Sequence, residues 1–280
     1  MDILITGAHG QLGKELEKQL CPSYTVICLG KKDLDITNKN QVDHVISHYK
    51  PQLIIHAAAF TAVDQCEIEP KKAMEVNALG TQYIAQAANK IQARMFYISS
   101  DYVFDGKKNQ PYTEEDEPNP QSIYGLSKWM GERLVLQCQN TTIIRTSWLY
   151  GHGGNNFVKT MLNLSKIGKE IKVVNDQVGS PTYVNDLTEV ILQLIHKKNG
   201  IYHISNSGSC TWHEFARAIF EEAGVNSDFV LPITTGEYKA LAPRPQFSVF
   251  SHQALLREKI AIPRPWKEAL KEFIRRETCH

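Results

Sequence analysis

The sequence lacks any long hydrophobic run. No apolar stretch approaches the roughly 20 residues that a helix needs to cross a bilayer, so we expect no membrane-spanning segment. The opening segment, Met1–Gly7, contains neither the basic residues nor the small-residue cleavage site of a secretory signal. Together these absences favour a cytoplasmic protein.

An excess of charge of one sign is also missing. Lys and Arg together number 31 and Asp and Glu together 30, so the formal net charge of the 280 residues is +1. A chain this close to neutral has no overall field that attracts nucleic acid or a membrane surface. We therefore expect neither kind of partner.

Clustered cysteines and histidines are missing too. The six cysteines are scattered without a Cys-x-x-Cys pair, and the ten histidines show no spacing that would ligate a metal. We assign no metal role to Cys279 and His280, which fall at the end of the chain. The pattern favours the reduced thiols of an intracellular protein.

Strand-like and helix-like segments alternate over the first half of the chain. Short apolar runs, typical of buried strands, occur at 3–5, 25–29, 53–55, 95–98 and 141–145, and we take the last as the sixth strand of one sheet. Helical spacing lies between them, with one helix capped near Asn38, whose Tyr49 should face inward, and a long one over 71–89. The alternation predicts an α/β fold with a Rossmann-type, doubly wound parallel sheet.

The pattern becomes irregular after Trp148. We predict a first domain over residues 1–150 and a smaller C-terminal α/β lobe over 151–280, with 183–204 returning to the first sheet. Residues 177–182 of the second lobe, Gln-Val-Gly-Ser-Pro-Thr, are typical of a turn. With 42% hydrophobic residues, the chain has enough apolar side chains to give both parts a buried core.

A glycine-rich loop follows the first predicted strand and opens a predicted helix. Glycines recur every third residue in it, with Gln11 and Leu12 between the last two: Gly7, Gly10 and Gly13. Glycine allows a tight turn and lets backbone N–H groups approach a phosphate at the positive end of the helix. The context of strand, loop and helix predicts a dinucleotide pyrophosphate site. A glycine loop without a ligand is the alternative.

The second predicted strand ends in Lys31 and Lys32 rather than in the acidic residue that commonly binds the ribose of NAD. The two lysines would tolerate a 2′-phosphate, so NADPH and NADH both stay open, and a solvated turn is the alternative. Asp35 could accept a hydrogen bond from the adenine amino group while Ile36 lies against the ring. Otherwise Asp35 is an ordinary loop carboxylate.

Small residues follow the third predicted strand. Ala57, Ala58 and Ala59, with Thr61 close behind, would leave room for a flat ligand above the sheet. Because ligands of doubly wound sheets bind at the carboxyl ends of the strands, we expect these four residues to contact the cofactor. A tightly packed loop needs small residues too, and this is the structural alternative.

Tyr124 and Lys128 are four residues apart on a predicted helix, so both side chains lie on one face. A phenol has a pKa of about 10, and a nearby cation lowers it, which would make Tyr124 a general acid or base. Ser100 follows the fourth predicted strand and is placed to bind a substrate carbonyl oxygen. An ordinary Tyr and Lys on an amphipathic helix is the alternative.

In combination, these motifs resemble the extended short-chain dehydrogenases/reductases. The glycine loop, Ser99-Ser-Asp101 and Tyr124-x-x-x-Lys128 occur in the order of that superfamily. Further segments, over nearly the full chain, are similar to the dTDP-4-dehydrorhamnose reductase family: 57–64, 100–104, 145–150, 155–157 and 174–182. One departure is Ser100, where many members have threonine, and serine supplies the same hydroxyl.

The resemblance implies an oxidoreductase that reduces the C4 keto group of dTDP-4-dehydro-β-L-rhamnose to dTDP-β-L-rhamnose with NADPH or NADH. This is the last step of dTDP-L-rhamnose synthesis. Tyr124 would donate a proton and Ser100 would bind the same oxygen, while Lys128 lowers the tyrosine pKa and holds the nicotinamide ribose. Substrate contacts are expected from Ser100, Asp101, Val103, Trp148, Gln177 and Arg244. For Trp148 a core position is the alternative to stacking on a sugar, and for Arg244 a surface ion pair is the alternative to binding a diphosphate.

Other functions of the same scaffold stay open. A nucleotide-sugar epimerase would recycle its NAD, whereas a dehydratase would carry an Asp-Glu pair after Ser100, which this chain lacks. A regulatory subunit of methionine adenosyltransferase would bind NADP and a protein partner without catalysis. Some relatives form magnesium-linked homodimers through glutamates, and Glu15 lies where one of them occurs. No full ligand set can be identified, so we assign no Mg²⁺ site.

Overall fold

A six-stranded parallel sheet lies at the centre of the larger part of the protein. The computed structural model describes residues 1–278. Its strand order is β10-β5-β4-β3-β1-β2. The strands span Asp2–Thr6 (β1), Thr25–Leu29 (β2), Leu53–His56 (β3), Arg94–Ser100 (β4), Thr141–Thr146 (β5) and Ile201–His203 (β10). The predicted doubly wound α/β class is confirmed. However, β5 is the fifth strand of this sheet along the chain and β10 is the sixth.

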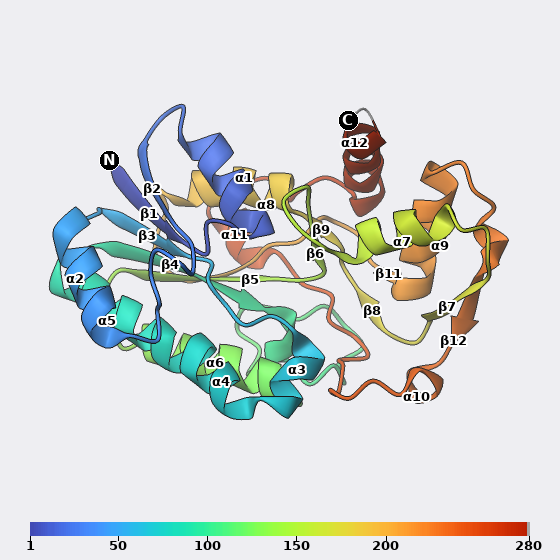
Figure 1. Ribbon diagram of the computed structural model, residues 1–280, viewed down its shortest axis with the longest axis horizontal. Helices are drawn as coiled ribbons and strands as arrows, with labels where there is room; N and C mark the ends of the chain where they lie inside the picture. The colour runs from blue at the N-terminus through green and yellow to red at the C-terminus, as the bar shows by residue number, and fades with distance from the viewer. Residues whose placement is uncertain (279–280) are drawn as a thin grey trace.

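Helices cover both faces of the sheet (Figure 1). One face carries α1 (Gln11–Leu20), α8 (Val184–Leu194) and α11 (Gln253–Arg257), and the other carries α2 (Lys39–Tyr49), α5 (Thr81–Lys90) and α6 (Ile123–Val135). Leu16, Leu187 and Leu255 contribute to the hydrophobic core on the first side. Val42, Ile84 and Val135 contribute to the core on the second side.

The position of β1 determines where a ligand can enter. Because β1 pairs with both β2 and β3, the order of the strands reverses there. In doubly wound sheets the carboxyl ends of the strands open into a crevice at such a reversal. The segments that follow β1, β3 and β4 therefore share one edge of the sheet, and they contain the glycine loop, the alanines, Ser100 and Tyr124.

The predicted helix over 71–89 is divided in the structure. It consists of α4 (Pro70–Met74), a π-helical turn η1 (Glu75–Gly80) and α5. A π turn adds one residue to the helical repeat, which an apolar pattern of ordinary period does not show. Tyr49 was expected to face inward, but it is 42% exposed at the end of α2, whereas the predicted cap at Asn38 accepts a hydrogen bond from Gln41 N.

The C-terminal elements gather on the other side of the molecule around a second core, to which Tyr150, Phe215 and Phe273 contribute (Figure 1). Here the segment expected to be a turn, 177–182, contains the short strand β8 (Val178–Gly179) and the start of β9 (Thr182–Tyr183). β10 lies in the large sheet, while the predicted division of the chain into domains stays a prediction. The remaining elements are α3 (Val63–Ile68), η2 (Asp101–Val103), β6 (Leu149–Tyr150), α7 (Phe157–Ser165), β7 (Ile171–Val174), β8 (Val178–Gly179), β9 (Thr182–Tyr183), β11 (Cys210–Thr211), α9 (Trp212–Glu222), η3 (Ser227–Phe229), β12 (Val230–Ile233), α10 (Thr235–Tyr238) and α12 (Trp266–Thr278).

Within residues 1–278, no helix combines the length and the apolar character needed to cross a membrane. In the same range, no group of three or more His, Cys, Asp or Glu side chains is placed to hold a metal ion. Cys279 and His280 lie outside the described residues.

Candidate active site

The glycine-rich loop makes a close turn against the end of β3. Gly7 has a φ of +70°, and a Cβ atom there would lie 2.7 Å from the Ala58 backbone nitrogen. A Cβ on Gly13 would lie 2.4 Å from the Gly7 carbonyl oxygen. The turn is closed by a hydrogen bond of 3.0 Å from Gly10 N to Gly7 O. Gly7 and Gly13 are therefore required by the shape of the loop.

The N-terminus of α1 has backbone donors that no cap satisfies. Its N-cap residue is Gly10, which offers no side chain, and its first turn contains no acidic residue. By contrast, α2, α6 and α7 are capped by Asn38, Ser122 and Asn156, whose side chains accept backbone hydrogen bonds. The free N–H groups and the positive end of the helix dipole suit an anionic group. This arrangement fits the pyrophosphate of a dinucleotide.

Gln11 links α1 to the C-terminal side of the molecule. Its Oε1 accepts a hydrogen bond of 2.8 Å from Asn156 Nδ2, which also donates to Gly151 O at 2.8 Å. Leu12 is buried and packs into the core behind the loop. Only the backbone of Leu12 can therefore face a ligand, whereas the half-buried side chain of Gln11 already has a partner.

Asp35 and Ile36 have different environments. The Asp35 carboxylate is exposed and accepts hydrogen bonds from Thr37 N at 3.0 Å and Thr37 Oγ1 at 2.7 Å, which lower its pKa. Ile36 is buried in the core and lies against Gly80, where a Cβ would be 3.0 Å from Ile36 Cδ1. Asp35 is thus a turn residue whose contact with adenine stays a prediction, as does the contact of Ile36.

A buried hydrogen-bond network fixes the strand end before the alanines. His56 Nδ1 lies 2.7 Å from Thr6 Oγ1, and its Nε2 lies 3.1 Å from Thr81 Oγ1. Burial lowers the pKa of His56 to about 3, so this imidazole is neutral. The network joins β1, β3 and α5 beneath the loop that follows. In that loop Ala57, Ala58 and Ala59 are half-buried and Thr61 is exposed.

Tyr124 lies in the first turn of α6, next to the end of β4. Its side chain is 8% exposed, and burial raises its pKa above the ordinary value for a phenol. An interaction with the Ser100 hydroxyl lowers the pKa again, but by less. We had expected Lys128 to lower it overall. In the protein alone, burial has the larger effect and keeps the phenol protonated.

Lys128 is enclosed beneath Tyr124. Its ammonium donates a hydrogen bond of 2.7 Å to Ile98 O and lies 4.3 Å from the centre of the Tyr97 ring. Burial lowers the pKa of Lys128 to about 7, and the charge of Glu132 acts in the opposite direction. The lysine is therefore a cation whose charge is sensitive to its surroundings near neutral pH.

Asp101 is the most enclosed of the predicted substrate-binding residues with a charge. It is 2% exposed, Oδ1 accepts a hydrogen bond of 3.0 Å from Ser100 Oγ, and Oδ2 is buried without a hydrogen-bond partner among residues 1–278. Burial raises the pKa of Asp101 to about 6, although the hydroxyls of Ser248 and Ser100 lower it. A buried carboxyl oxygen without a partner beside the reacting groups suits a hydrogen bond to a polar ligand.

The substitution Asp101→Asn is expected to gain stability relative to wild type as the pH rises. The folded pKa is about 6 against a usual 3.8, so the unfolded chain ionises first and wild-type stability falls through this interval and then levels off. Because each pKa unit is worth about 1.4 kcal/mol, the change in the difference in unfolding free energy between the two proteins is at most ~3 kcal/mol. Urea unfolding of both proteins at several pH values across the interval would measure it. A difference that does not change with pH would contradict the raised pKa.

Val103 does not have the surroundings of a ligand-binding side chain. It is completely buried in a cluster with Phe104, Tyr112 and Phe250. The side chain thus packs behind the site, and the structure lends no support to its predicted contact with a substrate. The sequence could not show this, because Phe250 comes to Val103 from a distant part of the chain.

Trp148 forms an aromatic stack on the C-terminal side. Its ring lies parallel to Trp212, with centroids 3.6 Å apart and an interplanar angle of 7°. Its φ is +46°, an unusual value for a bulky residue, and a Cβ on Gly179 would come within 2.5 Å of the indole. Strained backbone of this kind occurs preferentially at functional sites. The indole is half-buried, and its stacking on a sugar stays a prediction.

Gln177 and Arg244 already have partners in the protein. Gln177 is 3% exposed, and its Nε2 donates to Thr235 Oγ1 at 2.9 Å. Arg244 forms a bidentate ion pair with Asp64, with hydrogen bonds of 3.1 and 2.9 Å. The pair joins α3 to the segment before residue 250. The ion pair predicted as an alternative is therefore present, and the contacts of Gln177 and Arg244 with a diphosphate sugar stay predictions.

Sequence analysis did not identify two polar groups beside the catalytic residues. The side chain of Asn77 in η1 binds both backbone groups of Phe60 and Ser127 Oγ, and so fixes the turn against α6. Glu132 pairs with Arg145 and accepts from Ser99 Oγ at 2.5 Å. Glu132 follows Lys128 at the same spacing as Lys128 follows Tyr124, and this spacing was the signal available.

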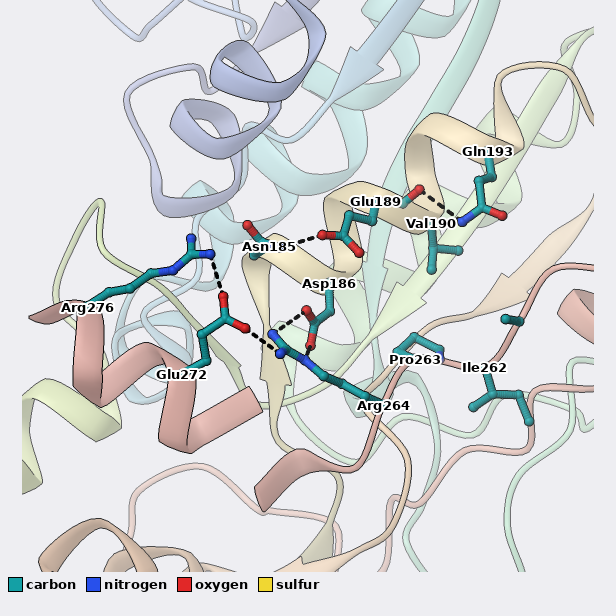
Figure 2. A pocket seen from close by; sticks show the side chains of 11 residues that line it. Asn185, Asp186, Glu189, Val190, Gln193, Ile262, Pro263, Arg264, Glu272 and Arg276 are labelled. Atoms are coloured by element: carbon teal, nitrogen blue, oxygen red, sulfur yellow. Dashed lines mark hydrogen bonds and ion pairs between the residues drawn. The ribbon is translucent and has the colours of Figure 1, made fainter. Parts of the chain in front are cut away.

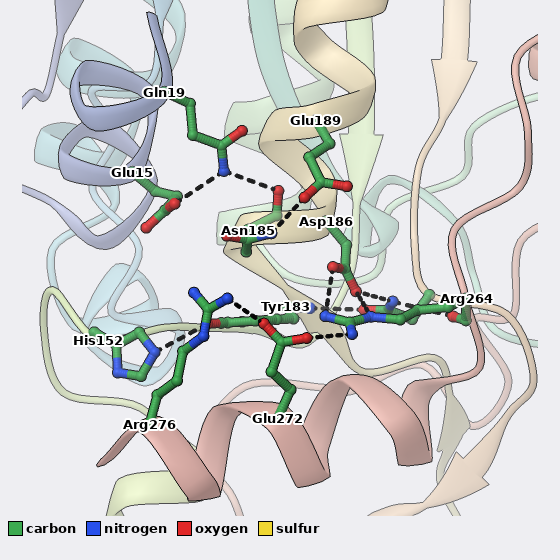
Figure 3. Close-up of polar contacts among 11 residues, drawn as sticks. Glu15, Gln19, His152, Tyr183, Asn185, Asp186, Glu189, Arg264, Glu272 and Arg276 are labelled. Carbon is green, nitrogen blue, oxygen red and sulfur yellow. Dashed lines mark hydrogen bonds and ion pairs between the residues drawn. The ribbon is translucent and has the colours of Figure 1, made fainter. Parts of the chain in front are cut away.

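Glu15 faces a polar surface away from Ser100 and Tyr124. It accepts a hydrogen bond of 2.9 Å from Gln19, which also donates to Asn185 O at 3.3 Å (Figure 3). Nearby, Arg264 lies between Asp186 of α8 and Glu272 of α12 and ties the two helices together (Figure 2). A hollow of about 460 Å³ opens beside this network. None of the predicted catalytic residues lines it.

Comparisons with known proteins agree over nearly the full length. A family model described as RmlD substrate binding domain matches residues 1–279. The spore coat polysaccharide biosynthesis protein SpsK of Bacillus subtilis (strain 168) is 50% identical over 274 residues, 97% of this chain and 96% of that protein. The dTDP-4-dehydrorhamnose reductase of Aggregatibacter actinomycetemcomitans is 44% identical over 286 residues, 97% of each. The crystal structure of dTDP-4-dehydrorhamnose reductase from Bacillus anthracis str. Ames in complex with NADP has a TM-score of 0.96 at 46% identity, covering 98% of this chain and 99% of that one.

Proposed function

The chain belongs to the RmlD substrate binding domain family, and from this premise we propose that it reduces the C4 keto group of dTDP-4-dehydro-β-L-rhamnose to dTDP-β-L-rhamnose with NADPH or NADH. One observation carries the proposal. Ser100, Tyr124 and Lys128 meet at the carboxyl edge of the sheet that also holds the uncapped start of α1. Relatives named dTDP-4-dehydrorhamnose reductase support the choice of substrate.

The cofactor would be held by residues in the segments that follow three adjacent strands, β1, β3 and β4. Backbone N–H groups of Gln11, Leu12 and Gly13 would bind the pyrophosphate at the α1 N-terminus. The alanines after β3 would leave space for the nicotinamide half, and the Lys128 ammonium would hydrogen-bond the ribose hydroxyls. When bound, the dihydronicotinamide supplies the hydride.

Proton transfer is the task of the protein. Tyr124 donates its phenolic proton to the oxygen on which negative charge develops, and the Ser100 hydroxyl donates a hydrogen bond to the same oxygen. A raised phenol pKa suits this direction of reaction, because the acid must be protonated before the hydride arrives. The Lys128 cation then stabilises the phenolate that remains. Removal of water from the buried site strengthens each of these charge interactions.

Substrate recognition falls to residues on both sides of the crevice. Asp101 would bind a sugar hydroxyl with its free carboxyl oxygen, and Trp148 would stack on an apolar face of the ring. Arg244 would face the diphosphate, where a guanidinium forms bidentate hydrogen bonds. A cytoplasmic location and a homodimer are further parts of the proposal that rest on the sequence.

Incubation with enzymatically generated dTDP-4-dehydrorhamnose and each reduced cofactor tests the proposal. We expect stoichiometric loss of the absorbance of the reduced nicotinamide and a product that carries one added hydride. With a cofactor deuterated at the transferred position, mass spectrometry should find one deuterium in the product. A nucleotide-sugar epimerase would recycle the cofactor and give no net oxidation. A regulatory subunit would bind the cofactor without any turnover.

A further inference from the structure

A buried ion pair lies directly behind the proposed catalytic residues. Arg145 of β5 donates two hydrogen bonds to Glu132 of α6, from Nε to Oε1 at 2.9 Å and from Nη2 to Oε2 at 2.7 Å. Both side chains are 2% exposed. Ser99 Oγ donates a third hydrogen bond, of 2.5 Å, to Oε1 of the same carboxylate. The glutamate is therefore held in one orientation by partners from two neighbouring strands.

The position of this pair calls for an explanation beyond stability. A buried ion pair adds little or nothing to the stability of a fold compared with apolar side chains of similar size, because the cost of desolvation offsets the attraction of the two charges. Arg145 also contacts His203 Nε2 at 3.3 Å and lies 5.0 Å from the centre of the Phe104 ring. These contacts fix the guanidinium beside the carboxylate.

Glu132 follows Lys128 by four residues on α6, so the two side chains lie on the same face of the helix. Lys128 is 2% exposed, and its named contacts are a carbonyl oxygen and an aromatic ring, neither of which carries a full negative charge. The buried charges behind the site are thus two cations, Lys128 and Arg145, and one anion, Glu132. Without Glu132, two cations would be buried with no anion between them.

We propose that Glu132 is a positioning residue whose carboxylate, oriented by Ser99 and Arg145, keeps the buried Lys128 ammonium protonated and thereby sets the upper pH limit of the reduction. The role of Lys128 in turnover rests on the proposed function. The charge relation between Lys128 and Glu132 does not. Arg145 has the opposite influence on Lys128, because its own positive charge opposes a second cation nearby.

The other titratable groups around Lys128 do not supply this charge. Among them are His56 of β3, Tyr97 of β4, Asp101 of η2 and Tyr124 of α6. Burial lowers the pKa of His56 to about 3 and raises those of Tyr97 and Tyr124, so all three are neutral near pH 7. Asp101, with a pKa of about 6, is also an anion at the alkaline limb, but its carboxylate is hydrogen-bonded to Ser100, and the charge that acts on Lys128 is that of Glu132. Consistent with the proposal, Glu132 is the group that raises the pKa of Lys128 against burial.

Two charge-removing substitutions should shift the pH profile in opposite directions. Glu132→Gln keeps the size of the side chain and removes the anion. The alkaline limb of the kcat/KM profile should therefore shift to lower pH by about one unit or more. At a pH above the shifted limb, kcat/KM should be about tenfold lower than in wild type. Arg145→Gln removes the competing cation and should move the limb upward. The double variant should return it toward wild type. Ser99→Ala is the matched control, because it removes one hydrogen bond to the carboxylate without changing its charge.

A direct measurement separates this inference from the proposed function. Protein labelled with isotope at the lysine side chains reports the titration of each ammonium by nuclear magnetic resonance, and Lys128→Met identifies the signal of Lys128. We expect its pKa to be lower in Glu132→Gln and higher in Arg145→Gln. This result holds even if wild type reduces no keto sugar. Equal shifts in both variants, or loss of activity and melting temperature without any shift, would overturn the proposal and leave the pair a purely structural link.

Discussion

Tyr124→Phe should lower kcat by about a thousandfold, within the range that a positioned general acid contributes. The substitution removes the phenolic proton and leaves the ring, which packs with Cys66 and Ala73. The ring also meets Tyr102 edge to face at 5.4 Å, so the fold should be preserved. Affinity for the reduced cofactor should change little, because the lost hydroxyl acts on the keto oxygen. Single-turnover kinetics and a fluorescence titration of the cofactor would measure the two effects separately.

Tyr102→Phe provides the matched control. Tyr102 is the neighbouring aromatic residue in the same cluster, and burial raises its pKa as well. The same atom is deleted, but no described contact places the Tyr102 hydroxyl on the reacting groups. We expect nearly full activity. If both phenylalanine variants retained wild-type turnover, Tyr124 would not be the proton donor, and a nearby group such as the Asp101 carboxyl would have to supply the proton.

The parts of this protein that the sequence predicts are those set by local pattern. The glycine loop, the start of α6 and the strands β1 to β5 follow from spacing and hydrophobic runs within short windows. The cap at Asn38 follows from a side chain that bonds three residues ahead. Such features depend on residues close together in the chain, so residue spacing and hydrophobic periodicity are enough to predict them.

The parts that sequence analysis missed depend on distant partners. Arg244 pairs with Asp64, 180 positions away, and this pair decides which of the two predicted roles the free protein shows. Gln177 meets Thr235 at a separation of 58, and Val103 is buried by a residue near position 250. The same applies to the pKa of Tyr124, because burial by several elements raises it by more than the hydrogen bond with Ser100 lowers it. Spacing identifies the reacting groups, whereas tertiary packing determines their charge states.

Gly13→Ala is expected to weaken cofactor binding by about a hundredfold, the equivalent of one or two charge-assisted hydrogen bonds. A Cβ at this position would lie 2.4 Å from Gly7 O and 2.5 Å from Ala8 Cα. Both are backbone atoms, so no side chain can turn away. The loop must shift relative to α1, and the backbone donors that face the pyrophosphate move with it.

Gly200→Ala separates this effect from a general intolerance of alanine. A Cβ on Gly200 would meet Tyr202 Cε2 at 3.7 Å, an ordinary contact, and binding should be unchanged. Overpacking in the loop also costs ~1–3 kcal/mol of stability, so the cofactor titration should be made well below the melting temperature of each variant. Wild-type affinity in Gly13→Ala at a normal melting temperature would show that the loop accommodates the methyl group without moving its donors. In that case the close approach of Gly13 to Gly7 O would not determine where the donors lie, and the requirement for glycine at this position would be wrong.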